Sequence, residues 1–195
     1  MSSRQKILEA VLKNQPQATL LPDISVFKGD NNNNTVQKYI DIFKTIGGSS
    51  HLVDNIAAVK ALINENFDVT KRIVTTLPEL SDSAELLSAK VDPHSYEDVE
   101  LAVLKAHFAV AENGAVWLTD DLMCQRIIPY ICQHLAVVIS AESIVPTLHE
   151  AYEKIGAGDY GFGGFIGGPS KTADIEQALV LGAHGPLTMT VFILK

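Results

Sequence analysis

The segment HLAVVIS, residues 134–140, decides how the chain is predicted to fold. A short apolar run of this kind is typical of a buried strand. A helix is expected directly after it, from Ala141 to Lys154, followed by a strand that ends in FGGFIGG, residues 162–168. Strands that alternate with helices indicate an α/β domain with a mainly parallel or mixed sheet.

The same alternation continues toward both ends of the chain. Val36, Tyr39, Ile40 and Phe43 lie at helical spacing, and the pair Gly47-Gly48 ends that helix. Further strands are expected near HLVD (51–54), KRIVTT (71–76), VELAVLKA (99–106), HFAVA (107–111), GAVWL (114–118) and LTMTVFILK (187–195), and a further helix around NIAAVKALINEN (55–66). In folds of this class, ligands gather outside the strand ends.

An N-terminal arm is expected before the α/β pattern begins. Apolar residues recur at helical spacing over residues 3–14, and Pro16 marks the end of that helix. The polar stretch from Lys28 to Asn34 has no apolar residue to bury, so it predicts a flexible loop. We therefore expect an N-terminal helix and flexible loop over residues 1–34 and a single globular domain over residues 35–195.

The composition excludes several classes of partner. The chain has 195 residues, of which 47% are hydrophobic, and a formal net charge of -8. This charge would repel a phosphate backbone, so nucleic acid is not an expected partner. No apolar stretch approaches the roughly 18 to 20 residues that a membrane span needs. The opening MSSRQKILEA is an amphipathic helix rather than a signal peptide, and a cytosolic protein is expected.

Neither cysteine nor histidine spacing predicts a metal centre. Cys124 and Cys132 are the two cysteines, and their separation suits neither an iron–sulfur cluster nor a zinc site. They are interpreted as buried apolar side chains. The six histidines show no ligand spacing, so no metal site and no bound cofactor are expected in this chain.

The segment GGPSKTADIEQALVLGAHGP, residues 167–186, is unusually rich in turn formers and polar side chains. It is predicted to run from a strand through Gly167-Gly168 into a helix, which would direct backbone N–H groups and a helix dipole at an anion. It is not a Walker A loop, because Ser170 stands where that motif needs a glycine. It does not match the dinucleotide-binding glycine pattern either.

Within the predicted helix, Ile175, Ala178, Leu179 and Gly182 would form the packed stripe. Asp174 and Glu176 are two residues apart, so they lie roughly 200° from one another around the axis and cannot form a facing pair. One interpretation is that these carboxylates complement the helix N-terminus, with Ser170 or Thr172 as its N-cap. The other is that the segment forms the rim of a small-molecule site to which the turn with His184 returns.

The motif GPSKTADIEQALVLGAHGP resembles the C-terminal signature of the LUD domain family, which is associated with lactate utilisation. FAVAENGAVWL, residues 108–118, and the opening SSRQKIL extend the similarity over most of the chain. Two departures from the family pattern are Lys171 in place of an arginine, which weakens bidentate anion binding, and Asn113 in place of a threonine.

This resemblance implies a three-layer α/β/α sandwich similar to the NagB/RpiA/CoA-transferase group. It also implies a role in bacterial oxidation of L-lactate to pyruvate, in which the chain would be a component without a cluster. Partner subunits would carry the iron–sulfur clusters, so electron transfer would take place on them. Whether the chain is an enzyme by itself stays open.

Glu112, Asn113 and Gly114 allow two interpretations. Asn113-Gly114 is the favoured dipeptide of a two-residue type I′ hairpin, which would leave Glu112 a strand residue beside a turn. The same three residues are similar to the signature of family I CoA transferases, in which the glutamate attacks an acyl-CoA. A third interpretation is that they contact a LUD-type ligand.

We therefore expect a small anionic ligand to bind where these segments meet. The candidate catalytic residues are Glu112, Asp174 and Glu176, and the candidate ligand-binding residues are Asn113, Gly114, Gly167, Gly168, Ser170, Lys171, Thr172 and His184. The alternatives are an acyl-CoA transferase-like or sugar-phosphate-binding enzyme of the same fold, and a non-catalytic assembly subunit.

Overall fold

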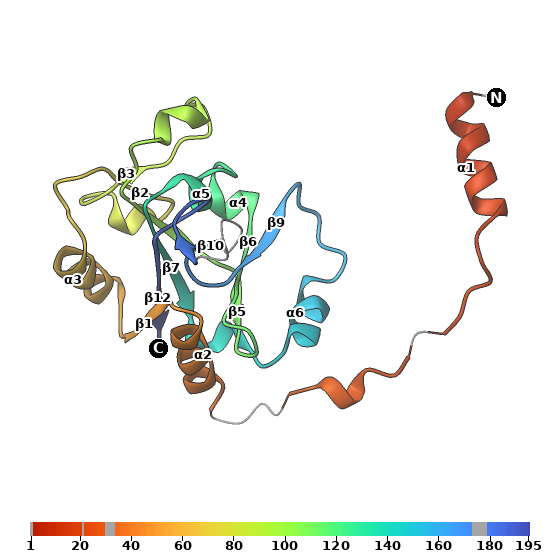
Figure 1. Cartoon of the computed structure of the whole chain (residues 1–195), viewed down its shortest axis with the longest axis horizontal. Helices are drawn as coiled ribbons and strands as arrows, with labels where there is room; N and C mark the ends of the chain where they lie inside the picture. Colours follow the sequence, from red (N-terminus) through yellow and green to blue (C-terminus); the bar gives the residue numbers. More distant parts are fainter. Residues whose placement is uncertain (1, 21, 30–33, 173–178) are drawn as a thin grey trace.

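A parallel sheet forms the centre of the molecule. The computed structural model describes residues 2–20, 22–29, 34–172 and 179–195. In these ranges six strands pair in parallel in the order β1-β12-β7-β4-β2-β3. They are β1 (Ser49–Val53), β2 (Ile73–Thr75), β3 (Glu85–Leu86), β4 (Leu101–Lys105), β7 (His134–Ser140) and β12 (Thr188–Leu194). The predicted mainly parallel sheet is confirmed, and its strands have their carboxyl ends at one edge (Figure 1).

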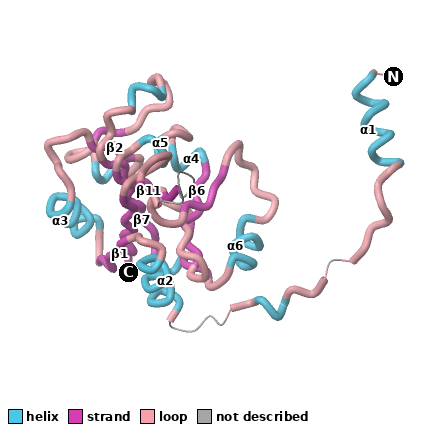
Figure 2. Tube along the Cα trace, in the orientation of Figure 1, coloured by secondary structure: helices cyan, strands magenta, loops and turns pink. Residues whose placement is uncertain are grey.

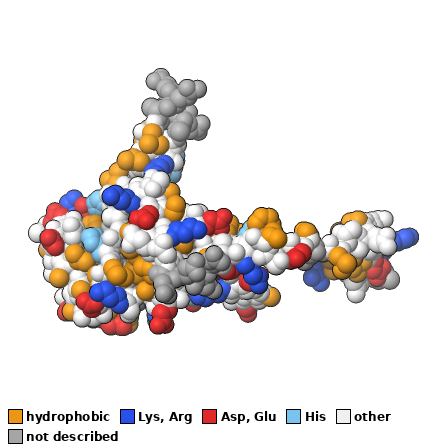
Figure 3. All heavy atoms as spheres, turned by 90° about the horizontal axis from the view of Figure 1, so that it is seen from below, with side chains coloured by type: hydrophobic (Ala, Val, Ile, Leu, Met, Phe, Trp, Pro, Cys, Tyr) orange, Lys and Arg blue, Asp and Glu red, His pale blue; other side chains and the backbone are white. Residues whose placement is uncertain are grey.

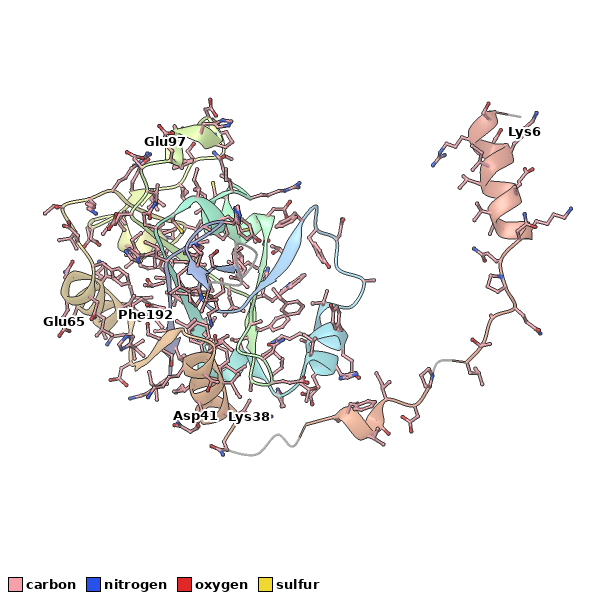
Figure 4. All side chains as sticks on the ribbon, in the orientation of Figure 1. Lys6, Lys38, Asp41, Glu65, Glu97 and Phe192 are labelled. Carbon is pink, nitrogen blue, oxygen red and sulfur yellow. The ribbon has the colours of Figure 1, made fainter. Side chains whose placement is uncertain are left out.

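Successive residues of the central strands point to opposite faces of the sheet. Val103, Val138 and Phe192 pack on one face against helix α3 (Ile56–Asn66), through Val59 and Ile63. Phe192 lies between this sheet and α3 in Figure 4. Because both faces are covered, these strands are continuous apolar runs rather than alternating ones.

A second sheet covers the other face. In the described part of the chain its order is β8-β5-β6-β9, with β8 (Ile144–Val145), β5 (Phe108–Val110), β6 (Val116–Thr119) and β9 (Gly163–Ile166). Helices α2 (Thr35–Thr45), α4 (Asp120–Met123) and α5 (Ile128–Ile131) fill the space beside it, and α6 (Leu148–Ile155) packs on its outer side. The layers run from α3 to α6 in Figures 1 and 2, which confirms the layered α/β sandwich.

The single helix predicted from Ala141 to Lys154 is wrong in its first half. Residues Ala141–Ser143 form one 3-10 turn, and Ile144–Val145 form β8, which pairs with β5. Helix α6 begins only after Thr147, whose hydroxyl accepts a hydrogen bond from the Glu150 N–H in a capping box. The pairing of β8 with β5 therefore outweighs the helical propensity of the residues before Pro146.

The helix predicted after PSKT, within residues 173–182, is contradicted at its described C-terminal end. Strand β10 (Lys171–Thr172) pairs antiparallel with β11 (Val180–Leu181). The Gly182 N–H donates to the Ser170 carbonyl at 3.1 Å. In a helix this N–H would instead donate to a carbonyl four residues earlier. The stripe residues Ile175 and Ala178, like residues 173–178 as a whole, lie outside the described residues.

The N-terminal arm stands apart from the layered body (Figure 1). Helix α1 (Ser3–Lys13) has a capping box from Ser2 and Gln5, and none of its residues is buried. Its exposed apolar side chains are visible along the arm in Figure 3. Phe27 stacks on His149 of α6 with ring centroids 4.9 Å apart, which attaches the arm to the body. No helix among the described residues is long and apolar enough to cross a bilayer.

The hydroxyl group of Tyr39 in α2 is buried without a hydrogen-bond partner among the described residues. We expect Tyr39→Phe to leave the free energy of unfolding unchanged or to raise it by up to about 1 kcal/mol, because the change removes an unpaired polar group. Urea unfolding measures the effect, with Tyr152→Phe, which alters a 61% exposed tyrosine, as the control. A loss of more than about 1 kcal/mol would mean that this hydroxyl group has a partner.

Candidate functional site

A cavity of about 250 Å³ lies between two turns, one at Gly167-Gly168 and one at His184–Pro186. We name it the two-turn cavity. It is lined by Pro129, Tyr130, Phe165, Ile166, Gly167, Gly168, Ser170, His184, Gly185 and Pro186. Four of the predicted ligand-binding residues, Gly167, Gly168, Ser170 and His184, therefore face one space.

The first turn follows the end of β9. Gly168 has φ +76°, a conformation that side-chain-bearing residues rarely adopt. A Cβ atom at Gly168 would lie 3.0 Å from the Ile46 carbonyl oxygen, and one at Gly167 would lie 3.7 Å from Ala115. The turn needs glycine at residue 168 both for its backbone conformation and for its close approach to α2.

The second turn is fastened to the first by backbone hydrogen bonds. The Ser170 N–H donates to the Pro186 carbonyl at 2.9 Å, and the Gly182 N–H donates to the Ser170 carbonyl. A Cβ atom at Gly185 would lie 3.3 Å from the Ser170 Cβ, so the two turns are in contact. This pairing brings His184 to the same cavity as Ser170.

Three polar side chains of the cavity have no partner among the described residues: the Ser170 hydroxyl, the His184 imidazole and the Tyr130 phenol. Burial raises the pKa of Tyr130, so its hydroxyl group stays a hydrogen-bond donor at neutral pH. Phe165 and Ile166 supply an apolar wall. Tyr130 was not predicted from the sequence, since no spacing rule connects residue 130 with the two turns.

Lys171 points away from the two-turn cavity. Its Nζ donates to the carbonyl of Ile46, the residue that caps the C-terminus of α2. A cation at this end of a helix is favoured by the helix dipole. Thr172 pairs with Val180 in the β10–β11 hairpin. Neither residue lines the cavity in the described structure.

The loop that contains Glu112 differs from the predicted two-residue type I′ turn. The Val110 N–H donates to the Ala115 carbonyl at 2.8 Å and the Gly114 N–H to the Val110 carbonyl at 2.9 Å, which closes a four-residue loop over 111–114. Gly114 has φ +73°, but Asn113 does not have the positive φ that a type I′ turn requires. Instead, the Asn113 side chain accepts a hydrogen bond from the Ala115 N–H at 3.0 Å.

Glu112 faces helix α6 rather than the two-turn cavity. Its Oε2 accepts a hydrogen bond from the N–H of Leu148, the first residue of α6, at 2.7 Å. The loop itself lies near the cavity, because β6 pairs with β9 and Ala115 packs against Gly167. The loop of Glu112 and the turn at Gly167 therefore lie side by side, but the Glu112 carboxylate binds the N-terminus of α6. Asp174 and Glu176 lie outside the described residues.

A second polar cluster was not predicted from the sequence. His107 Nε2 lies 2.5 Å from the Thr119 Oγ1, and the Thr119 hydroxyl donates to Asp121 Oδ1. These residues border a cavity of about 300 Å³ with aromatic walls, among them Phe108 and Trp117. His107 lies directly before β5, Thr119 ends β6 and Asp121 lies in α4, so only the fold brings them together.

Cys132 is buried, as expected, and burial raises the pKa of its thiol to about 12. Cys124 is only partly buried, and burial also raises the pKa of its thiol. Both thiols are therefore protonated at neutral pH. Among the described residues, no group of three His, Cys, Asp or Glu side chains could hold a metal ion.

Comparison with known proteins identifies relatives of the chain. The family model described as the LUD domain matches residues 4–194. Lactate utilization protein C of Oceanobacillus iheyensis is 30% identical over 105 residues, which cover 50% of this chain and 44% of that protein. Lactate utilization protein C of Geobacillus thermodenitrificans is 33% identical over 98 residues, which cover 47% of this chain and 40% of that protein. The chain thus spans less than half the length of these relatives.

A solved structure has the same fold. It is a DUF162 family protein from Deinococcus radiodurans, with a TM-score of 0.62 and 15% sequence identity. The superposition covers 83% of this chain and 97% of that chain. At this identity the likeness shows the fold alone.

The contact between Glu112 and α6 predicts a structural effect of mutation. We expect Glu112→Ala to lower the free energy of unfolding by about 0.5 kcal/mol, because it removes a charged acceptor from a helix N-terminus. Glu112→Gln keeps an acceptor and should cost less. Urea unfolding compares both with Glu97→Ala, which removes an exposed carboxylate after the 3-10 helix Pro93–Tyr96. Equal stability of Glu112→Ala and wild type would contradict a structural role for this carboxylate.

Proposed function

Because the chain belongs to the LUD domain family, we propose that it takes part in lactate utilisation, the process named for its relatives. The proposed ligand is lactate or pyruvate, bound in the two-turn cavity. One observation carries this proposal. Three polar side chains without partners among the described residues, Tyr130, Ser170 and His184, face one small cavity that also has an apolar wall.

The chemistry of the cavity matches a small 2-hydroxy or 2-oxo carboxylate. The hydroxyl groups of Tyr130 and Ser170 are donors for carboxylate oxygens. His184 can accept the proton of a ligand hydroxyl or donate to a ligand carbonyl, according to its tautomer. Phe165 and Ile166 would contact the methyl group. Small-molecule sites commonly combine apolar walls with a few polar groups in this way.

Oxidation of lactate to pyruvate releases two electrons and two protons, and the electrons need an acceptor. We place that acceptor on partner subunits with iron–sulfur clusters, in line with the family resemblance. A purely structural role as an assembly subunit is the alternative, and it predicts co-purification with such partners but no binding of lactate or pyruvate.

The two remaining alternatives have less support from the geometry. The transferase hypothesis needs a Glu112 carboxylate that can attack an acyl-CoA, whereas this group accepts the Leu148 N–H. The sugar-phosphate hypothesis would be favoured by cations at the site, but no Lys or Arg lines the described cavity. Acyl-CoA exchange that is lost in Glu112→Gln would support the transferase after all.

Calorimetric titration of the full chain with lactate and with pyruvate tests the proposed site. Each of Ser170→Ala and Tyr130→Phe should weaken binding about five- to tenfold, since each removes one hydrogen bond of about 1 kcal/mol. His184→Ala should weaken binding as well. His94→Ala is the matched control, because His94 is an exposed histidine of the 3-10 helix Pro93–Tyr96.

Affinity that is unchanged in both hydroxyl variants would exclude the two-turn cavity as the ligand site. Absence of any binding to the wild-type chain, together with capture of cysteine-rich iron–sulfur partners, would favour the assembly role.

A further inference from the structure

A different cavity lies at the carboxyl edge of the central sheet. It has a volume of about 310 Å³, and we name it the carboxyl-edge cavity. Its lining residues are Ile56, Thr76, Leu77, Pro78, Glu79, Lys105, Asp121, Leu122, Val138 and Leu194. They come from the residues just after β2, from the C-terminal parts of β4, β7 and β12, from the 3-10 helix Pro78–Leu80, from α4 and from the start of α3. Open α/β sheets bind ligands at this edge.

Two groups in this cavity are suited to a ligand carboxylate. The Thr76 Oγ1 is buried without a hydrogen-bond partner among the described residues, although a buried hydroxyl normally has one. Lys105, the last residue of β4, makes no ion pair or hydrogen bond through its ammonium group in the described structure. Helix α3 begins at Ile56, so the positive end of its dipole lies on the same side.

A third group in the cavity is suited to a ligand cation. Asp121 Oδ1 accepts the Thr119 hydroxyl, which His107 also contacts, so the carboxylate is held in place. Its Oδ2 has no partner among the described residues. Lys105 and Asp121 do not pair with one another, although both line the cavity. Glu79 adds a second carboxylate at the exposed rim.

The rest of the wall is apolar. Leu77 and Val138 are 6% and 2% exposed, and Ile56, Leu122 and Leu194 line the same space. An aliphatic side chain would therefore be desolvated there, which favours binding. The cavity combines a free cation, a free hydroxyl group, a free carboxylate oxygen and an apolar wall.

We infer that the carboxyl-edge cavity binds an aliphatic α-amino acid. The ligand carboxylate is bound by Lys105 and the Thr76 hydroxyl, its ammonium group by Asp121, and its side chain by Val138 and the neighbouring apolar residues. This ligand class gives a partner to Lys105, to the Thr76 hydroxyl and to Asp121 at once, while Glu79 stays at the exposed rim. The inference is independent of the proposed lactate site, which lies at the end of β9.

Leucine is the probe, added to the full chain with ¹³C-labelled methyl groups in Ile, Leu and Val. We expect leucine to shift the methyl resonances of Ile56, Val138 and Leu194. 4-Methylpentanoate lacks the ammonium group and leucinamide lacks the carboxylate, so each should bind at least tenfold more weakly than leucine. Their side chains are the same, which isolates the charged contacts.

Three variants test the protein side of the same contacts. Lys105→Met and Asp121→Asn should each weaken leucine binding at least tenfold, and Thr76→Val should weaken it about fivefold. Lys90→Met is the matched control, because Lys90 is exposed and does not line the cavity. Ser170→Ala should leave leucine binding unchanged, which separates this site from the lactate site.

Failure of leucine to shift these methyl resonances at millimolar concentration would overturn the inference. Equal binding of leucine and 4-methylpentanoate would also overturn it, as would wild-type affinity in Lys105→Met. The ligand series on the wild-type chain gives a result even if Asp121→Asn does not fold.

Discussion

The close approach of three glycines to Ile46 fixes the position of the two-turn cavity. A Cβ atom at Gly114 would lie 2.9 Å from the Ile46 Cδ1, and one at Gly168 would lie 3.0 Å from the Ile46 carbonyl oxygen. Gly167 also lies against this side chain, and the Lys171 ammonium donates to the same carbonyl. Since Gly114 and Gly168 have positive φ, larger residues there would meet both steric overlap and backbone strain. The loop of Glu112 and the turn at Gly167-Gly168 thus both pack against the C-terminal end of α2.

The two cavities present different polar groups to a ligand. The two-turn cavity is formed where β9 of the second sheet ends, and its polar groups are neutral hydroxyl groups and an imidazole. The carboxyl-edge cavity is formed by the central sheet, and its polar groups include a lysine and a carboxylate. Asp121 also borders the aromatic cavity with His107 and Thr119, so the cluster of these three residues connects two neighbouring cavities. Each cavity combines residues from segments far apart in the chain.

The sequence predicted the central strands well because their apolar runs reflect burial on both faces. HLAVVIS and the final strand were predicted from this signal alone, and the turn with His184 does return to Ser170. The helix expected within residues 173–182 was wrong at its C-terminal end because β10 and β11 pair across a segment whose apolar spacing also suits a helix. The role of Glu112 depends on a contact with Leu148, 36 residues away, and Tyr130 reaches its cavity only through the fold. Local patterns cannot encode such distant contacts, so the sequence predicted Ser170 and His184 of the two-turn cavity but not Tyr130 or the partner of Glu112.

A crystal structure of the chain with bound lactate tests the central claim most directly. The account predicts the lactate carboxylate within hydrogen-bond distance of the hydroxyl groups of Tyr130 and Ser170, with the methyl group against Phe165. Lactate bound elsewhere, for instance between Lys105 and Asp121, with the two-turn cavity holding only water, would contradict the assignment of this cavity as the lactate site.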